Sequence, residues 1–171
     1  MRPKSFAGMR CSVAGALEAI GDRWTILVLR DLSLGLHRYD ALRASTGIPT
    51  TTLASRLRNL QGHGLVERVR YQNRPPRHEY VLTEKGRGFW KVITALREWG
   101  DRWDLAGCGA PTLELFDQGT GRALRLALVD SSTDLAASPA RIRYRPGPGA
   151  DDAVRALIDS INQGANAWPQ Q

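Results

Sequence analysis

Cysteine is scarce in this sequence, and long apolar runs are absent. Cys11 and Cys108 are the two cysteines among 171 residues, too few for a disulfide framework or for a four-ligand metal site made of cysteine alone. No run of about eighteen apolar residues predicts a membrane-spanning helix. Arg2 and Lys4 are not followed by the apolar stretch of a secretory signal. We therefore expect a cytoplasmic protein that carries no metal and no other cofactor.

The sequence also lacks the motifs of enzyme active sites. Its three histidines are His37, His63 and His78, and with nearby carboxylates they would be the ingredients of an enzyme, the alternative class. No nucleophile elbow, metal-spaced pair, phosphate-binding loop or dinucleotide fingerprint accompanies them. A polar contact at a helix end accounts for His63, and one in a strand accounts for His78. We therefore expect no enzymatic activity.

Positive charge is in excess and unevenly placed. The net charge is +7. Residues 1–105 hold 18 Lys or Arg against 10 Asp or Glu, whereas residues 106–171 hold 6 against 7. Most of these cations are arginine, whose guanidinium pairs with phosphate through two parallel hydrogen bonds. The pattern favours a polyanion as partner, although a merely soluble basic protein would carry the same total.

Apolar residues at steps of three and four predict helices over residues 11–20, 23–34, 39–45 and 50–62. Gly21, Gly35 and Gly47 follow the first three as helix stops. Pro49 forces an extended residue before the fourth helix. Two helices joined by a short turn that contains glycine are typical of a helix-turn-helix motif.

The helix over residues 50–62 has a leucine stripe on one side and a polar, acid-free surface on the other. A solvated helix face normally mixes both signs of charge, so this composition indicates a negatively charged partner. We expect the helix to lie in a DNA major groove. The predicted contacts are Thr50, Thr51, Thr52, Ser55, Arg56, Arg58 and Asn59. Two alternatives remain open: a solvated face capped by Thr50, and an Arg56 that braces a neighbouring helix.

Beyond residue 64 the apolar period changes from helical to two, which predicts a β-hairpin with strands over residues 65–72 and 78–82. Pro75 and Pro76 stiffen its loop, and Arg74 and Arg77 flank them. We expect both arginines to contact the DNA backbone or minor groove. The alternative is a solvated loop whose prolines merely prevent edge pairing.

Residues 84–103 are predicted to form one long helix rich in tryptophan. Its apolar surface exceeds what one small subunit can cover, which indicates a second copy as partner. The predicted dimer interface consists of Leu17, Trp90, Ile93, Leu96, Trp99 and Trp103.

Several sequence motifs, which occur in the same order as these elements, resemble those of a known protein family. The run from Cys11 to Leu32, Leu57-Arg-Asn-Leu with Gly64-Leu-Val-Glu-Arg, and Glu79-Tyr-Val-Leu-Thr-Glu-Lys-Gly closely resemble the HxlR-type, MarR-like, winged helix-turn-helix bacterial transcriptional regulators. The resemblance covers residues 9–103. It implies a homodimer whose terminal helices pair, whose fourth helix enters the major groove of a palindromic operator, and whose wing contacts phosphate or the minor groove.

The resemblance also directs attention to two positions. Pro49 stands where family members often have a small capping residue, so the helix cap could instead fall on Thr50. Some members sense oxidants or electrophiles through a cysteine where Cys11 stands, just before the first helix and beside Arg10. A helix start and a neighbouring cation both favour a reactive thiolate. The alternative is an inert, buried thiol.

Two domains are expected: residues 1–103 for DNA binding and dimerisation, and residues 104–171 as a small appendage. In the appendage we expect strands over residues 112–116, 122–129 and 141–145, a helix over residues 151–161, and frayed last residues. The expected fold is mainly α with a β-hairpin wing, plus a small C-terminal α+β appendage.

The expected function is a repressor that binds double-stranded DNA as a homodimer, with a small molecule or an oxidant as candidate effector. The alternative is an effector-binding or protein-interaction module built on the tryptophan-rich helix and the appendage.

Overall fold

The computed structural model describes residues 5–138 and 141–163. The chain divides into two compact units, residues 1–116 and 117–171, and each is described by itself. The sequence-based division placed the boundary after Trp103. In the structure, residues 104–116 belong to the first unit, where Arg97 donates a hydrogen bond of 2.8 Å to the Leu113 carbonyl.

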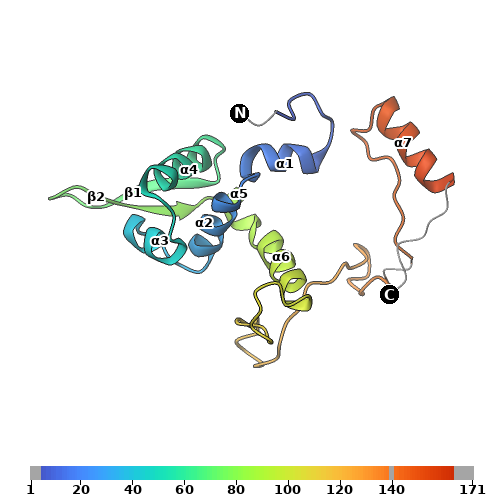
Figure 1. Cartoon of the computed structure of the whole chain (residues 1–171). Helices are drawn as coiled ribbons and strands as arrows, with labels where there is room; N and C mark the ends of the chain where they lie inside the picture. The colour runs from blue at the N-terminus through green and yellow to red at the C-terminus, as the bar shows by residue number, and fades with distance from the viewer. Residues whose placement is uncertain (1–4, 139–140, 164–171) are drawn as a thin grey trace. The chain divides into compact units, whose positions relative to one another are not determined.

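Four helices begin the first unit: α1 (Ser12–Ile20), α2 (Arg23–Ser33), α3 (Tyr39–Thr46) and α4 (Thr50–Gly62) (Figure 1). These bounds confirm the four predicted helices to within a residue. Helix α2 supplies the centre of the core, because Val28 and Leu29 are completely buried. Asp22 caps α2 by accepting hydrogen bonds from the Trp24 and Thr25 amides at 3.0 and 3.1 Å.

The turn between α3 and α4 is set by Gly47 and Pro49. Gly47 adopts the left-handed conformation that ends α3, with φ of 66°, and the buried Ile48 then anchors the turn in the core. Helix α4 begins at Thr50 with Pro49 in the N-cap position. The alternative in which Thr50 caps the helix is therefore wrong. The Tyr39 hydroxyl donates to the Thr50 carbonyl at 2.7 Å, which joins the beginnings of α3 and α4.

Strands β1 (Val66–Gln72) and β2 (Arg77–Leu82) pair antiparallel and form the predicted wing (Figure 1). The register shifts between Arg70 and Gln72, so the hairpin contains a β-bulge at this point. The segment before α3 adds to the free edge of β2. Arg38 forms a β-bridge with Glu79, and the Tyr80 amide donates to the His37 carbonyl at 2.8 Å.

The single long helix predicted over residues 84–103 is wrong, because the structure has two helices, α5 (Glu84–Gly88) and α6 (Trp90–Arg102), separated at Phe89. The helical hydrogen-bond pattern changes at Phe89, whose amide donates to the Gly86 carbonyl three residues back, at 3.1 Å. Gly86 is buried so tightly that a Cβ at this position would lie 2.0 Å from the Leu65 carbonyl oxygen. Helix α5 is thereby packed against the base of the hairpin, and α6 begins after Phe89.

The strands predicted over residues 112–116, 122–129 and 141–145 are also wrong. In the described parts of these segments the structure has turns and isolated bridges, such as the one between Val129 and Ala136. None of the described residues from 112 onwards is fully buried, so no apolar face holds an extended segment in a sheet. Helix α7 (Asp152–Gln163) confirms the predicted amphipathic helix. Fraying was predicted for the last residues of the chain, and residues 164–171 lie outside the described part.

None of the described helices is both long and apolar enough to cross a membrane.

Candidate nucleic-acid interface

The outer face of α4 is polar, exposed and free of acidic residues. Leu53, Leu57 and Leu60 are at most 1% exposed and fix the inner side of the helix in the core. The predicted contact residues therefore face outward: Thr50, Thr51, Ser55 and Arg58 are exposed, and Thr52 and Asn59 are half-buried at the flanks. A row of hydroxyls, an amide and a guanidinium can bond to phosphate oxygens and base edges.

Arg56 behaves differently from the other predicted contacts. Its Nε lies 3.0 Å from Asp22 Oδ1, the same oxygen that caps α2. The guanidinium thus ties α4 to the beginning of α2. The structure favours the alternative in which Arg56 braces a neighbouring helix over a contact with DNA.

The loop of the hairpin is held in shape by its own side chains. Arg70 donates to the Gln72 and Asn73 carbonyls at 3.2 and 2.8 Å, and Gln72 Nε2 donates to the Arg74 carbonyl at 3.0 Å. Arg74 and Arg77 are exposed on either side of the two prolines. The result is an ordered tip that carries two guanidinium groups.

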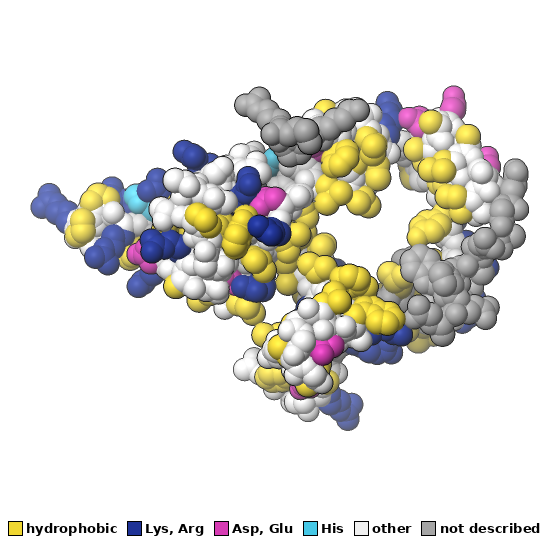
Figure 2. Space-filling model, in the orientation of Figure 1, with side chains coloured by type: hydrophobic (Ala, Val, Ile, Leu, Met, Phe, Trp, Pro, Cys, Tyr) yellow, Lys and Arg dark blue, Asp and Glu magenta, His cyan; other side chains and the backbone are white. Residues whose placement is uncertain are grey.

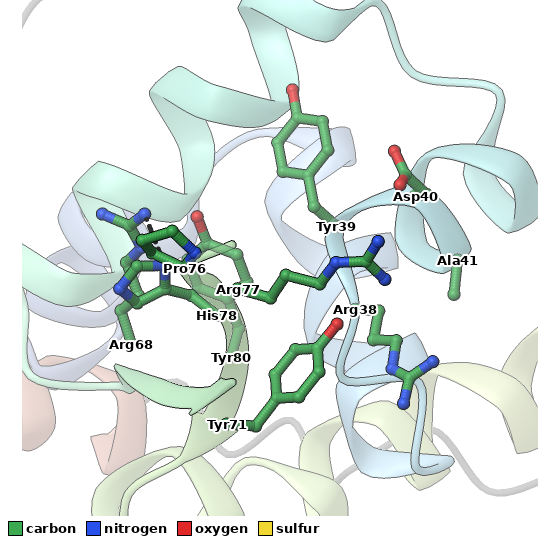
Figure 3. Close-up of a pocket in the computed structure, with 10 residues that line it drawn as sticks. All are labelled: Arg38, Tyr39, Asp40, Ala41, Arg68, Tyr71, Pro76, Arg77, His78 and Tyr80. Carbon is green, nitrogen blue, oxygen red and sulfur yellow. Dashed lines mark hydrogen bonds between the residues drawn. The ribbon is translucent and has the colours of Figure 1, made fainter. Parts of the chain in front are cut away.

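A cleft of about 660 Å³ opens between the beginning of α3 and the hairpin. Figure 3 shows Arg77 reaching from β2 toward the beginning of α3, and Tyr71 beside Arg38. The Arg38 guanidinium lies 5.0 Å from the centre of the Tyr71 ring, a cation–π contact. The lining residues are Arg38, Tyr39, Asp40, Ala41, Arg68, Tyr71, Pro76, Arg77, His78 and Tyr80.

His78 lies at this cleft in contact with Arg68. Arg68 lies against it with its terminal nitrogen 3.0 Å from His78 Nδ1. The pKa of His78 is lowered from its ordinary value, first because the ring loses water around it and then because Arg68 and Arg70 are positively charged. The contact with His78 restrains the Arg68 guanidinium at the edge of the cleft.

Sequence reasoning missed Arg38, Arg68 and Tyr71 as members of a site. The alternation over residues 65–72 places Arg68 on one side of the hairpin. No local signal pairs Arg38 with Tyr71, because this contact depends on the β-bridge to β2 and on the bulge in β1. Figure 2 shows Lys and Arg side chains gathered over the hairpin and the helices beside it. The first unit therefore presents a cationic surface around α4 and the hairpin.

A separate apolar surface lies on α1 and α6. Val92, Leu96, Trp99 and Trp103 form a stripe at steps of four, three and four, and each is about half exposed, between 47 and 56%. In Figure 2 hydrophobic side chains gather over both helices. Leu17 on α1 is exposed as well. This spacing is the one by which helices pair along their length.

Two of the predicted interface residues lie elsewhere on α6. Trp90 and Ile93 line a cavity of about 540 Å³, together with residues of α2 and of the segment 112–115. Ile93 is half-buried, whereas Trp90 keeps 42% of its surface exposed. Both side chains therefore contribute to packing within the first unit.

Both cysteines are exposed and unpaired by disulfide. Cys11 occupies the N-cap position of α1, and its side chain does not cap the helix. The Cys108 amide donates to Asp104 Oδ1 at 2.8 Å in a loop after α6. The alternative of a buried thiol at Cys11 is wrong. Among the described residues no three His, Cys, Asp or Glu side chains are grouped to hold a metal ion.

Residues 19–106, which span α2 to α6 and thus the cationic surface, match the model of the HxlR-like helix-turn-helix family. The chain belongs to this family. Rv3095 of Mycobacterium tuberculosis, named an uncharacterized HTH-type transcriptional regulator, is 39% identical over 138 residues, which are 81% of this chain and 87% of that protein. The HxlR-like chain is accordingly a transcriptional regulator with a helix-turn-helix DNA-binding domain.

Solved structures agree with this assignment. PA1607, described as a candidate transcription factor, superposes with a TM-score of 0.71 at 30% identity, over 84% of this chain and all of that one. The redox regulator HypR in its oxidized form superposes with a TM-score of 0.51 at 32% identity, over 54% of this HxlR-like chain and 96% of HypR. The winged helix-turn-helix fold predicted from the sequence is thus confirmed.

Proposed function

We propose that the protein is a homodimeric repressor that binds a palindromic operator, with α4 in the major groove and the hairpin tip on the backbone or minor groove. The observation that carries the proposal is the outward, acid-free face of α4. Thr51, Ser55 and Arg58 stand out from a helix whose opposite side is fixed in the core. A compact dimer seated on a promoter blocks polymerase without further contacts.

The proposed base-reading residue is Arg58. Among the described residues, the structure records no hydrogen bond or ion pair of the Arg58 side chain. The guanidinium can therefore bind in a DNA groove. Arg58→Ala should weaken operator binding by about 1 to 3 kcal/mol if the guanidinium reads a base, and lower the salt dependence if it only neutralises phosphate. Arg155→Ala on α7 is the matched control, because it removes the same charge from an exposed site in the second unit.

The experiment is fluorescence anisotropy with an operator selected from a random duplex pool, repeated over a range of salt concentrations. The proposal expects affinity to fall steeply with salt for the wild type and the control, and expects Arg58→Ala to bind more weakly. Equal affinity of Arg58→Ala and the control for the operator would contradict the proposed contact of α4 with DNA. Absence of salt-dependent binding would favour the interaction-module alternative.

Dimerisation is proposed through the apolar stripe on α6 with Leu17 of α1. The stripe would otherwise leave Trp99 and Trp103 more than half exposed in water, and burial of aromatic surface drives association. Two copies joined here would present two α4 helices related by a twofold axis, as a palindromic operator requires.

A redox response is proposed at Cys11, which is exposed in a fold shared with the redox regulator HypR. In this step hydrogen peroxide oxidises the Cys11 thiol to a sulfenic acid and is itself reduced to water. Mass spectrometry after mild peroxide treatment tests the proposal, with Cys11→Ser as the control. An unmodified Cys11 with DNA binding intact would contradict it.

The cavity lined by Trp90 and Ile93 is the proposed place for a small-molecule effector.

A further inference from the structure

The cleft between α3 and the hairpin has the chemistry of an anion site. Three arginines, Arg38, Arg68 and Arg77, line it against a single carboxylate, that of Asp40. Guanidinium groups bind phosphate oxygens through paired, charge-assisted hydrogen bonds. The positive charge of the cleft therefore exceeds the negative charge of Asp40.

The position of the cleft relates it to the recognition helix. Tyr39 lines the cleft and donates its hydroxyl to the carbonyl of Thr50, the first residue of α4. The wall opposite belongs to the hairpin (Figure 3). The cleft thus lies between the beginning of α4 and the hairpin, the two elements proposed to contact DNA.

Arg38 is fixed in position by contacts within the protein itself. Its backbone forms the bridge to Glu79, and its guanidinium stacks on the Tyr71 ring at 5.0 Å. The bulge between Arg70 and Gln72 falls at Tyr71, and bulges turn a side chain away from the regular alternation of a strand. An arginine restrained in this way loses less rotamer freedom when it binds.

We propose that this cleft binds a phosphate of the DNA backbone through Arg38 and Arg77, with Tyr71 as a positioning residue that presents Arg38. The inference rests on the proposed DNA binding and adds the residues that grip one strand beside α4. Arg77 reaches into the cleft from the hairpin (Figure 3) and forms no ion pair that the structure records in its described residues. One phosphate would thus join α3 and the wing.

The test is anisotropy with a 30-base-pair duplex of arbitrary sequence, titrated over salt. Arg38→Gln combined with Arg77→Gln should lower the slope of log affinity against log salt by about 0.9, the value for the one phosphate that both arginines share. Each single substitution should lower the slope by part of that amount. Tyr71→Leu should weaken binding about two- to fivefold, the worth of an exposed cation–π contact, and leave the slope unchanged. Tyr71→Phe keeps the ring and should bind as the wild type does.

Circular dichroism confirms that each variant is folded. Unchanged slopes in Arg38→Gln and Arg77→Gln, with the loss in Arg58→Ala retained, would overturn the cleft proposal and leave the proposed function standing. Absence of wild-type binding at every salt concentration would instead overturn the proposed function.

A second experiment uses inorganic phosphate as the ligand, because a free phosphate ion would bind to arginine in the same way as a phosphate of the DNA backbone. The proposal expects no saturable binding of phosphate alone to the wild type in NMR titration. Saturable binding that is lost in Arg38→Gln, together with an unchanged DNA slope, would assign the cleft to free phosphate and overturn the proposal.

Discussion

Gly86 is the residue at which a single added methyl group should most disturb the wing. A Cβ there would lie 2.0 Å from the Leu65 carbonyl oxygen and 3.1 Å from Leu82 Cδ2. The first of these is a backbone atom and cannot move aside freely. It also accepts the hydrogen bond of 3.1 Å from the Thr83 amide, where α5 begins.

Gly86→Ala should therefore destabilise the protein by about 1 to 3 kcal/mol. Overpacking of a tight site costs about 1 to 3 kcal/mol, loss of the bond between Thr83 and Leu65 adds about 1 kcal/mol, and the better helix propensity of alanine offsets up to about 1 kcal/mol. Gly88→Ala is the matched control in the same helix. No atom lies within 4 Å of its added Cβ, so the better helix propensity of alanine should stabilise by up to about 1 kcal/mol.

The assay is urea unfolding followed by circular dichroism, which yields the free energy of unfolding of each variant. The two substitutions should change it in opposite directions. Equal stability of Gly86→Ala and the wild type would refute the close contact between α5 and the hairpin.

Three further predictions concern other parts of the first unit. Leu96→Glu should convert a dimer into a monomer in size-exclusion chromatography with light scattering, whereas Lys91→Glu, away from the stripe, should not; a dimeric Leu96→Glu would contradict the interface. Asp22→Ala should lower the free energy of unfolding by about 1 to 2 kcal/mol through loss of the α2 cap and of the Arg56 partner, as urea unfolding would show; no change would refute that role. Because the pKa of His78 is lowered in the folded state, its contribution to stability is present above its ordinary value of 6.5 and is lost as pH falls below it. Urea midpoints at pH 7.5 and 5.5 should therefore differ more in the wild type than in His78→Gln, and equal differences would contradict this.

The helices of the first unit could be predicted because their signals are local. The Leu53, Leu57 and Leu60 stripe fixes which face of α4 is buried, and Gly47 ends α3 where its left-handed backbone is needed. The outward face of α4 follows from the same stripe. Periodicity and helix stops were therefore sufficient for both the motif and its recognition face.

The features that were missed depend on contacts between distant residues. The packing of α5 against the hairpin depends on the contact of Gly86 with Leu65, and the cleft depends on the stacking of Arg38 on Tyr71. Neither pair is close in the sequence. The strands predicted after residue 104 failed for a related reason. Alternation specifies a strand only where a buried face selects it, and no described residue from 104 onwards is fully buried.

The most direct test of the account is dimethyl sulfate footprinting of the protein on a selected operator. This reagent methylates guanine N7 in the major groove and adenine N3 in the minor groove. The account predicts guanine N7 protection in two patches centred about one helical turn apart, and weaker protection with Arg58→Ala. Protection of a single patch, or of adenine N3 alone, would contradict the insertion of two symmetry-related α4 helices into successive major grooves.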